Sequence, residues 1–254
     1  MKKGTIHELR PGSKWDQVWK RARLSNTLNT NSLFGFCFNR LMEKHLEKGK
    51  KLLEIGCAGG KFLVYFNQKF DCDVYGVDCS PVGCKLAKKN LELAKTNGTI
   101  ICDDIFQCEK LQKESFDVVF SGGFIEHFDE TETVIEKHVA LLKPGGTLII
   151  ELPNMFGLHG YVFRIFNRDS YYEHKLLTAK MVEECFSNLG VQIEESAYIG
   201  SLILESGGKP GFIQPFFYLA NKVFYYMIRG LNMFFKSKYV SPYIVIIGRK
   251  PLGV

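Results

Sequence analysis

Short apolar runs alternate with helical patterns between residues 51 and 153, and this alternation constrains the fold more than any other feature. Helical patterns near 60–69, 81–95 and 131–142 lie between runs that are typical of buried strands. Strands that alternate with helices form parallel sheets, so the sequence predicts an α/β fold. The five predicted strands are KLLEIG (51–56), DVYGVD (73–78), GTIICDD (98–104), FDVVFS (116–121) and GTLIIELP (146–153).

The segments before and after this region complete the predicted architecture. VQIEESAYI (191–199) and YIVIIGRK (243–250) are expected to be late strands that pair with each other at the edge of the sheet. Residues 1–48 and residues 205–240 carry helical patterns, and residues 205–240 are rich in aromatic residues. The predicted units are an N-terminal helical cap (1–48), a core (49–204), a helical insertion (205–240) and the last strand of the core (241–254).

Composition is that of an ordinary globular protein, with 46% hydrophobic and 24% charged residues in 254 positions. The eight cysteines form no C-x-x-C pair and no zinc-ligand spacing, which favours a reducing compartment over a disulfide framework. The N-terminal stretch MKKGTIHELRPGSKW contains no apolar run, so no signal peptide is predicted. We therefore expect a cytoplasmic location.

A glycine turn, GCAGG (56–60), follows the first predicted strand and is preceded by Glu54. A strand, a glycine turn and a helix N-terminus form a concave site that a ligand can approach closely. The dinucleotide-binding fingerprint fits poorly, because Ala58 and Lys61 replace two of its glycines. An acid beside the turn favours a ligand with a positive charge over a pyrophosphate.

Acids also end the next two predicted strands. Asp78 ends the second strand, where a carboxylate can accept hydrogen bonds from both hydroxyls of a ribose. Asp103 and Asp104 end the third strand, where a carboxylate can accept from an adenine amino group. Three successive strands that end in acids predict one ligand site along the carboxyl edge of the sheet.

These features closely resemble the class I S-adenosylmethionine-dependent methyltransferases over residues 50–153. The resemblance implies a Rossmann-like, seven-stranded, mostly parallel sheet with an antiparallel last strand, flanked by helices. It rests on the motifs EIGCAGG (54–60), GVDCS (76–80), CDDI (102–105), FDVVFSGGFIEHF (116–128) and LLKPGGTLII (141–150). It implies S-adenosyl-L-methionine as the cofactor, held by Glu54, Gly56, Cys57, Gly60, Asp78, Cys79, Asp104, Ile105 and Ser121. The usual middle glycine is Ala58 here, which predicts a tighter turn.

Methyl transfer to a hydroxyl requires a group that removes the acceptor's proton, and histidine suits that role near neutral pH. His127 directly follows the fourth predicted strand, in a stretch that lines the cofactor pocket in this family. His159 and His174 lie in the aromatic segment after the fifth strand and are the other candidate bases. No second pair of ligands accompanies Glu126 and His127, so no metal site is predicted.

The predicted activity is methyl transfer to a hydroxyl of a bulky or lipid-linked small molecule, such as a glycan intermediate or a quinone-like ring. The alternatives are N-methylation of a metabolite or a protein, and a catalytically silent module that binds the cofactor or a membrane. DNA amino-methylation is disfavoured, because residues 121–124 read Ser-Gly-Gly-Phe in place of an Asn- or Asp-Pro-Pro-Tyr motif. We expect a small-molecule substrate and no nucleic acid partner.

The segment 211–240 combines positive charge with aromatic residues. Seven basic residues and no acid occur from position 206 to the end, whereas residues 1–205 carry 26 basic and 27 acidic residues. Phe216, Leu219 and Val223 begin an apolar stripe at helical spacing. We expect peripheral contact of residues 212–236 with an anionic membrane. A lid over the active site, a homodimer contact and packing within the chain are the alternatives.

Overall fold

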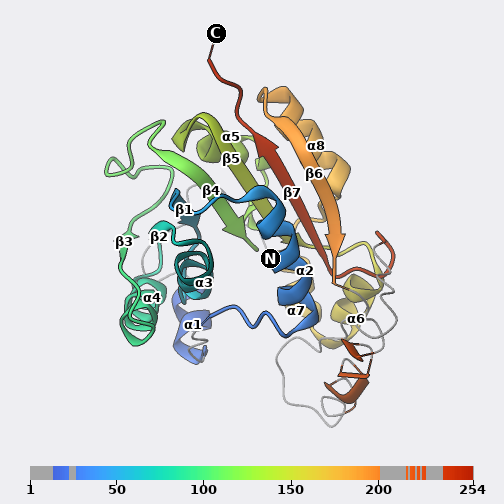
Figure 1. Cartoon of the computed structure of the whole chain (residues 1–254). Coiled ribbons are helices and arrows are strands. Elements are labelled where there is room, and N and C mark those ends of the chain that lie inside the picture. The colour runs from blue at the N-terminus through green and yellow to red at the C-terminus, as the bar shows by residue number, and fades with distance from the viewer. Residues whose placement is uncertain are drawn as a thin grey trace.

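The computed structural model of the protein describes residues 14–22, 27–200, 216, 218–220, 222–223, 225–226 and 237–253. These residues form a seven-stranded sheet that is flanked by helices on both faces (Figure 1). The strand order is β3-β2-β1-β4-β5-β7-β6, and β7 runs antiparallel to its two neighbours. The α/β class and the antiparallel last strand that the sequence predicted are confirmed.

The strands match the predicted runs closely. β7 pairs with β6, as expected, but it also pairs with β5, so β6 alone forms that edge of the sheet. The strands are β1 (Lys51–Ile55), β2 (Asp73–Asp78), β3 (Gly98–Cys102), β4 (Phe116–Gly122), β5 (Leu142–Pro153), β6 (Gln192–Ile199) and β7 (Tyr243–Arg249).

The helices that connect the strands also occur where the sequence predicts them. The segment between β5 and β6, where the sequence analysis places His159 and His174, is largely helical. The helices are α1 (Lys14–Arg21), α2 (Leu33–His45), α3 (Lys61–Phe70), α4 (Pro81–Leu93), the short 3-10 helix η2 (Ile125–His127), α5 (Thr131–Leu141), α6 (Leu158–Phe166), α7 (Arg168–Glu173) and α8 (Ala179–Asn188).

Local sequence signals explain where several of these helices begin and end. Ser80 caps α4, because its hydroxyl accepts a hydrogen bond from the backbone N–H of Gly83 at 3.0 Å. Pro81 occupies the first turn of that helix, where its missing N–H has no cost. Gly190 follows α8 with a φ of +73°, a conformation that glycine adopts without strain.

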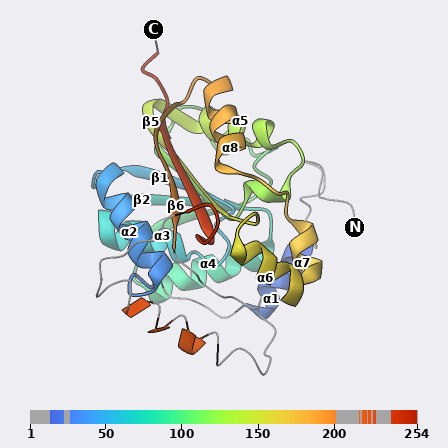
Figure 2. The ribbon, with the colours of Figure 1, turned by 90° about the vertical axis from the view of Figure 1, so that its right-hand side faces the viewer.

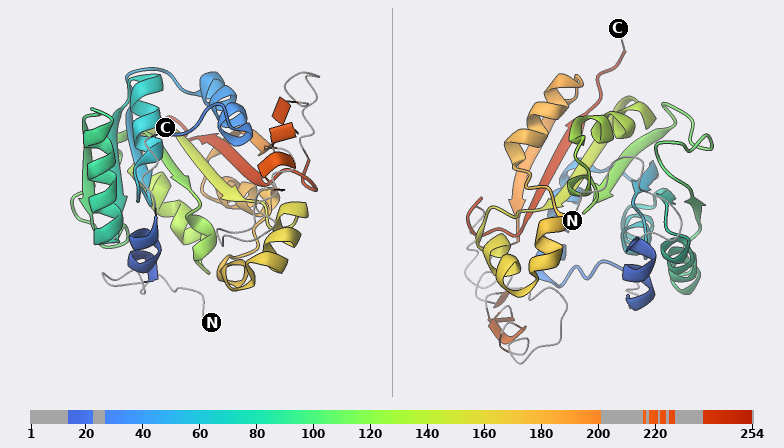
Figure 3. Two further views of the ribbon diagram at one scale, coloured as in Figure 1. Left: turned by 90° about the horizontal axis from the view of Figure 1, so that it is seen from below. Right: turned by 180° about the vertical axis from the view of Figure 1, so that it is seen from behind.

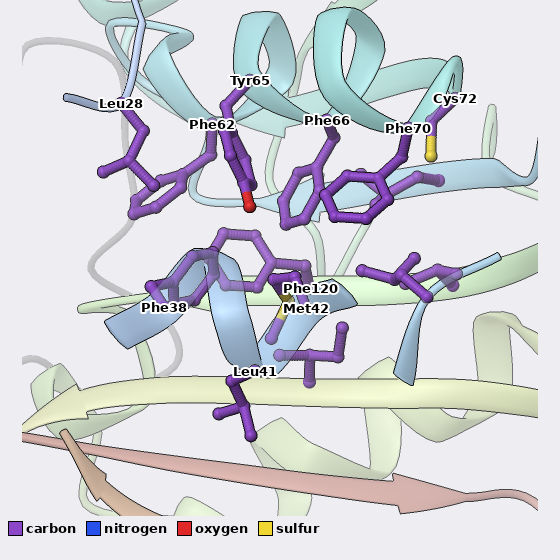
Figure 4. Packing of buried hydrophobic residues seen from close by; sticks show 14 of the residues in the cluster. Leu28, Phe38, Leu41, Met42, Phe62, Tyr65, Phe66, Phe70, Cys72 and Phe120 are labelled. Carbon is purple, nitrogen blue, oxygen red and sulfur yellow. The ribbon is translucent and has the colours of Figure 1, made fainter. Parts of the chain in front are cut away.

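An aromatic cluster joins α2 and α3 to one face of the sheet. Phe62, Phe66 and Phe70 of α3 point toward Phe38 of α2 and Phe120 of β4 (Figure 4). The ring centroids of Phe66 and Phe120 are 5.2 Å apart, and those of Phe38 and Phe120 are 5.9 Å apart. These contacts hold the glycine turn in place, because that turn connects β1 to α3.

The opposite face of the sheet is covered by α5 and α8 (Figures 2 and 3). Val134 and Ile135 of α5 and Phe186 of α8 are fully buried there against the central strands. With both faces covered, the carboxyl ends of the parallel strands remain as the edge at which a ligand can bind. The helices α1, α6 and α7 lie at that end of the molecule (Figure 1).

The N-terminal cap is helical where the structure describes it, in α1 and α2. Most of the predicted insertion, 205–240, lies outside the described residues, although those between 216 and 226 are helical. The domain boundaries stay a prediction. Among the described helices, none combines the length and the apolar character that a membrane span requires.

Candidate functional site

A cavity of about 910 Å³ opens at the carboxyl ends of the central strands. Its walls come from β1, β2, β4, β5 and η2, from the α1 helix and from the described residues between 218 and 226. A volume of this size is at the upper end of the range for small-molecule sites and can hold a cofactor together with an acceptor. The predicted site at the edge of the sheet is therefore a real cavity.

Glu54 lies on β1 at the base of this cavity and is only 4% exposed. Burial raises the pKa of its carboxyl to about 8, although the positive charge of Lys61 opposes the shift. Its Oε2 atom is buried and has no hydrogen-bond partner within the described part of the chain. A buried carboxyl oxygen without a partner favours a donor or a cation at this position.

Asp78 ends β2 and is held rigidly by the glycine turn. Its two carboxylate oxygens accept hydrogen bonds from the backbone N–H groups of Ser80, at 2.8 Å, and Ala58, at 3.1 Å. Burial nevertheless raises the pKa of its carboxyl to about 6. Asp78 and the neighbouring Cys79 both line the cavity, and burial raises the pKa of the Cys79 thiol to about 12.

The end of β3 contributes Asp103 and Ile105 to the cavity wall. Asp104, which the sequence analysis favoured, is not among the described residues that line it. Its Oδ1 atom accepts a hydrogen bond from the backbone N–H of Phe106 at 3.0 Å, which stabilises the turn after β3. The geometry thus favours Asp103 over Asp104 as the acid that faces a ligand.

Gly56 lines the cavity with a φ of +77°, and a Cβ atom at this position would lie 2.6 Å from the Phe124 ring. Only glycine allows this close approach of the backbone to the ring that covers it. Glu54, Gly56 and Phe124 all line the cavity beside this turn.

Cys57, Gly60 and Ser121 were also predicted to bind the cofactor, but none of them is among the described residues that line the cavity. Cys57 is buried against Gly76, and Gly60 packs against the backbone of Ala87 in α4. Their contribution is to the packing of the turn.

Ser121 is fully buried and bonded to His138, whose Nε2 atom lies 3.0 Å from the Ser121 hydroxyl. The second ring nitrogen of His138 faces the carbonyl oxygen of Val134 at 2.8 Å, so it carries the proton and donates. Burial lowers the pKa of His138 to about 4, and the imidazole stays neutral. No pattern in the sequence links these two positions.

The helix α1 covers the cofactor end of the cavity. Trp15 and Trp19, which are four residues apart, both line it, and Trp19 lies over Gly59 and Gly83. Asp16 anchors the helix through a hydrogen bond that it accepts from the hydroxyl of Ser80. Two residues four positions apart share one face of a helix, but nothing in the sequence places that face on the cavity.

Two of the three candidate histidines come together at the other end. His127 and His174 both line the cavity, with their ring centroids 4.8 Å apart. His159 is buried in α6 beside Phe163 and Tyr243 and is not among the described residues of the wall. His174 is the one described residue between 154 and 178 that lines the cavity, so no phenylalanine or tyrosine that the structure describes in this segment belongs to the wall.

Two more buried carboxyl groups line this end, and sequence reasoning assigned neither to the site. Burial raises the pKa of Glu126 to about 8 and that of Glu151 to about 7. Glu151 lies within the apolar run of β5, just as Glu54 lies within that of β1. An acid on an otherwise apolar strand was the signal that could have revealed it.

Residues from the C-terminal region close the cavity. Tyr218, Lys222 and Tyr225, which share one helical face, line the wall. Phe216, Leu219 and Val223, which the sequence analysis placed on an apolar stripe, are instead 57–67% exposed. The face that points inward is therefore the tyrosine and lysine face.

This strand order, with a reversed β7 and acids at the ends of β1, β2 and β3, defines the class I fold of S-adenosylmethionine-dependent methyltransferases. The residues also fit that cofactor. Glu54 presents an oxygen without a hydrogen-bond partner in the described structure, Asp78 presents a fixed carboxylate, and Gly56 leaves room for a close backbone approach.

Comparisons with known proteins agree with this assignment. Residues 53–150 match the sequence model of the family described as "Methyltransferase domain". The ubiquinone biosynthesis O-methyltransferase of Coxiella burnetii is 35% identical over 109 residues, which cover 42% of this chain and 45% of that protein. Phosphoethanolamine N-methyltransferase 3 of Arabidopsis thaliana is 31% identical over 107 residues, which cover 41% of this chain and 21% of that protein.

Solved structures share the fold at low sequence identity. A phosphoethanolamine N-methyltransferase 2 of Haemonchus contortus, in complex with S-adenosylhomocysteine, superposes with a TM-score of 0.60 and 20% identity, covering 93% of this chain and 56% of that one. The chain spans less than half the length of the two curated relatives described above. It contains a class I S-adenosylmethionine-dependent methyltransferase domain.

The positions of Asp103 and Asp104 lead to a prediction about cofactor affinity. Asp103→Ala should weaken binding of S-adenosylhomocysteine about tenfold or more, because a hydrogen bond to a charged group contributes about 1.5–3 kcal/mol. Asp104→Ala serves as the matched control and should change the affinity less, since its carboxylate is used within the turn. Isothermal titration calorimetry measures the affinity of both variants for S-adenosylhomocysteine. A larger loss of affinity in Asp104→Ala than in Asp103→Ala would assign the contact with the cofactor to Asp104.

The raised pKa of Glu54 leads to a second prediction. At pH 7 a carboxyl with a pKa of about 8 is mostly protonated, whereas the ammonium group of the cofactor favours the carboxylate. Affinity for S-adenosylhomocysteine should therefore fall as the pH is lowered from about 8 to 6, by up to about tenfold per pH unit. Glu54→Gln should flatten this profile in calorimetry, and a profile that is unchanged in the variant would contradict the assignment.

Proposed function

We propose that the protein transfers the methyl group of S-adenosylmethionine to a hydroxyl of a bulky, apolar small molecule, such as a quinone-like ring or a lipid-linked glycan intermediate. The observation that carries this proposal is the single cavity that joins the Glu54 and Asp78 wall to the His127 and His174 wall. Similarity to ubiquinone biosynthesis O-methyltransferases over the core supports a hydroxyl acceptor.

At one end, Glu54, Asp78 and Asp103 would hold the amino-acid, ribose and adenine parts of the cofactor. When bound, the sulfonium supplies a methyl group that is already reactive, so the protein has to align the acceptor and exclude water. Trp15 and Trp19 cover this end and limit the access of solvent.

At the other end, the wall suits a flat and largely apolar acceptor. Phe34, Tyr225 and Tyr243 line it, and the ring centroids of Phe34 and Tyr243 are 4.6 Å apart. His127 and His174 supply polar groups beside the place that a hydroxyl would occupy. His127 or His174 would take the hydroxyl proton as the acceptor oxygen attacks the methyl carbon, and the electron pair of the broken C–S bond would stay on sulfur.

Methylation of a nitrogen is the second candidate, and one observation favours it. Glu126 and Glu151 are buried carboxyl groups at the acceptor end, and carboxylates attract a cationic amine. Similarity to a phosphoethanolamine N-methyltransferase is in line with this. A silent module is a weaker alternative, because the acids that would hold the cofactor are all present.

Transfer of a radioactive methyl group tests the proposed activity directly. Labelled S-adenosylmethionine should pass its methyl group to a hydroxylated aromatic ring with an isoprenoid tail, and less to the same ring without the tail. Label found only on an amine of the same size would move the assignment to nitrogen. Binding of the cofactor without transfer to any acceptor would support the silent module.

We also propose that the protein meets its acceptor at an anionic membrane surface in the cytoplasm. Leu158, Tyr161 and Ile165 share one face of α6 and are 38–63% exposed. Arg164 and Arg168 lie beside that face. Exposed apolar side chains next to cations are typical of contact with anionic lipid.

Further support for this location comes from the C-terminal region and the cysteines. Phe216, Leu219, Val223 and Tyr226 are exposed. The described residues between 216 and 226 lie beyond the carboxyl ends of the strands (Figures 1 and 2). The eight cysteines form no C-x-x-C pair and no zinc-ligand spacing, which favours a reducing compartment. A homodimer through this face is the alternative.

Co-sedimentation with liposomes tests the membrane contact. The full chain should sediment with vesicles that contain phosphatidylserine and less so at high salt, because salt screens the attraction. Tyr161→Glu and Ile165→Glu should each reduce the bound fraction. Leu93→Glu on α4, where the native side chain is 60% exposed, is the matched control and should bind normally. Equal losses in all three variants, or a stable dimer that ignores vesicles, would contradict the proposal.

A further inference from the structure

Glu126, His127 and His174 bring one carboxylate and two imidazoles together at the acceptor end of the cavity. One ligand atom from each of the three residues lies within 4.8 Å of the other two. The Oε1 atom of Glu126 is 3.9 Å from the Nε2 atom of His127. The first two residues belong to η2, whereas His174 follows α7, so the fold and not the local sequence assembles this cluster.

The backbone holds the two segments together beside the cluster. The N–H of Lys175 donates a hydrogen bond to the carbonyl oxygen of Glu126 at 2.6 Å. The ammonium group of Lys175 donates to the carbonyl oxygen of Asp129 and, at 2.9 Å, to the hydroxyl of Thr131. The hydrogen bonds of Lys175 keep His174 next to Glu126 and His127, as a site with a fixed geometry requires.

A hydrogen bond also sets the tautomer of His174. Its Nδ1 atom lies 2.6 Å from the carbonyl oxygen of Ser170. A carbonyl oxygen can only accept, so Nδ1 carries the proton and the lone pair is on Nε2. A histidine that binds a metal usually donates its other ring N–H to such a group, which orients the ring and raises its basicity.

Glu126 supplies the carboxyl group of the cluster, and it is only 2% exposed. Its Oε2 atom is buried and has no hydrogen-bond partner in the described part of the protein. Transfer of a carboxylate into such surroundings is costly unless a cation or a donor compensates it. A second buried acid, Glu151, lines the same cavity.

We propose that Glu126, His127 and His174 bind a divalent first-row transition metal ion. Two imidazoles and one carboxylate suit such ions better than Mg²⁺ or Ca²⁺, which prefer oxygen ligands. With bonds of about 2.1 Å, two ligand atoms of one tetrahedral ion lie about 3.4 Å apart, so ligand atoms that are now within 4.8 Å of one another would move together by about 1.4 Å at most. Three protein ligands leave positions open toward the cavity.

This inference rests on the proposed function, because the open positions face the place of the acceptor. A divalent ion lowers the pKa of a hydroxyl that binds to it, so the acceptor would release its proton to water before its oxygen attacks the methyl carbon. The two histidines would then serve as ligands, and the predicted role of His127 as a base would not be needed.

Manganese is the best probe for this site, because it binds oxygen and nitrogen ligands in preference to the thiolates of the eight cysteines. The chelator-treated full chain should bind one Mn²⁺, measured by the loss of the free-ion electron paramagnetic resonance signal. His174→Ala and Glu126→Gln should weaken binding by about tenfold or more. His159→Ala, which removes a histidine of α6 outside the cluster, is the matched control and should bind Mn²⁺ with unchanged affinity.

Two results would overturn the proposal: the absence of Mn²⁺ binding to the native chain, or equal loss of binding in the His159→Ala control. Circular dichroism on each variant identifies any that fails to fold, and Glu126→Gln preserves the shape of the buried side chain. Binding of S-adenosylhomocysteine is measured in parallel on the same samples. If S-adenosylhomocysteine binds and Mn²⁺ does not, only the proposed metal site is contradicted. If Mn²⁺ binds and S-adenosylhomocysteine does not, the proposed methyltransferase function is contradicted.

Discussion

The site depends on the hydrogen bonds that connect the turn after β1 to the end of β2. The backbone N–H groups of Gly56 and Cys57 both donate to the carbonyl oxygen of Val77, at 2.9 and 3.2 Å. Ala58 then donates to the Asp78 carboxylate, so the chain folds over the end of β2 immediately after it leaves β1. This geometry requires Gly76 to lack a side chain, because a Cβ atom there would lie 2.6 Å from the Cys57 sulfur.

These hydrogen bonds between the turn after β1 and the end of β2 determine where the residues of the cavity wall lie. They place Glu54 and Asp78 on one wall, and they bring α3 back onto the sheet, where the aromatic cluster around Phe120 anchors it. At the acceptor end, Glu126 and Glu151 are buried, and burial raises the pKa of both carboxyl groups, although the positive charge of Lys61 opposes the shift at Glu151.

Buried acids at the site reduce the stability of the empty protein. A carboxyl whose pKa is raised by folding binds its proton more tightly in the folded state than in the unfolded state. Its contribution to stability is therefore most favourable below the unfolded pKa and is lost as the pH rises through the folded pKa, between about 4.5 and 8 for Glu54 and Glu126. Cations that bind beside these acids offset this loss, so binding and stability are coupled.

Much of the fold could be predicted from the sequence, because each strand and helix has its own local signal. The alternation of apolar runs, the Ser80 cap and the glycine turn all depend on residues that are close in sequence. Glu54 and Asp78 were found because each lies at the end of its own strand.

The rest of the site depends on contacts between distant segments. His174 reaches the cavity and His159 does not, because the Lys175 backbone is bonded to Glu126 while His159 packs against Tyr243. Asp103 and Asp104 are adjacent, and only the turn decides which of them faces inward. No periodicity in the sequence carries that information.

The central claim is that this cavity binds S-adenosylmethionine, and the fluorescence of the chain tests it most directly. The protein contains two tryptophans, Trp15 and Trp19, and both line the cavity. Titration with S-adenosylhomocysteine should change their emission in a saturable manner at one ligand per chain, and Asp78→Ala should shift the midpoint to higher concentration. Emission that does not change up to millimolar ligand, or an Asp78→Ala curve identical to the native one, would contradict the claim.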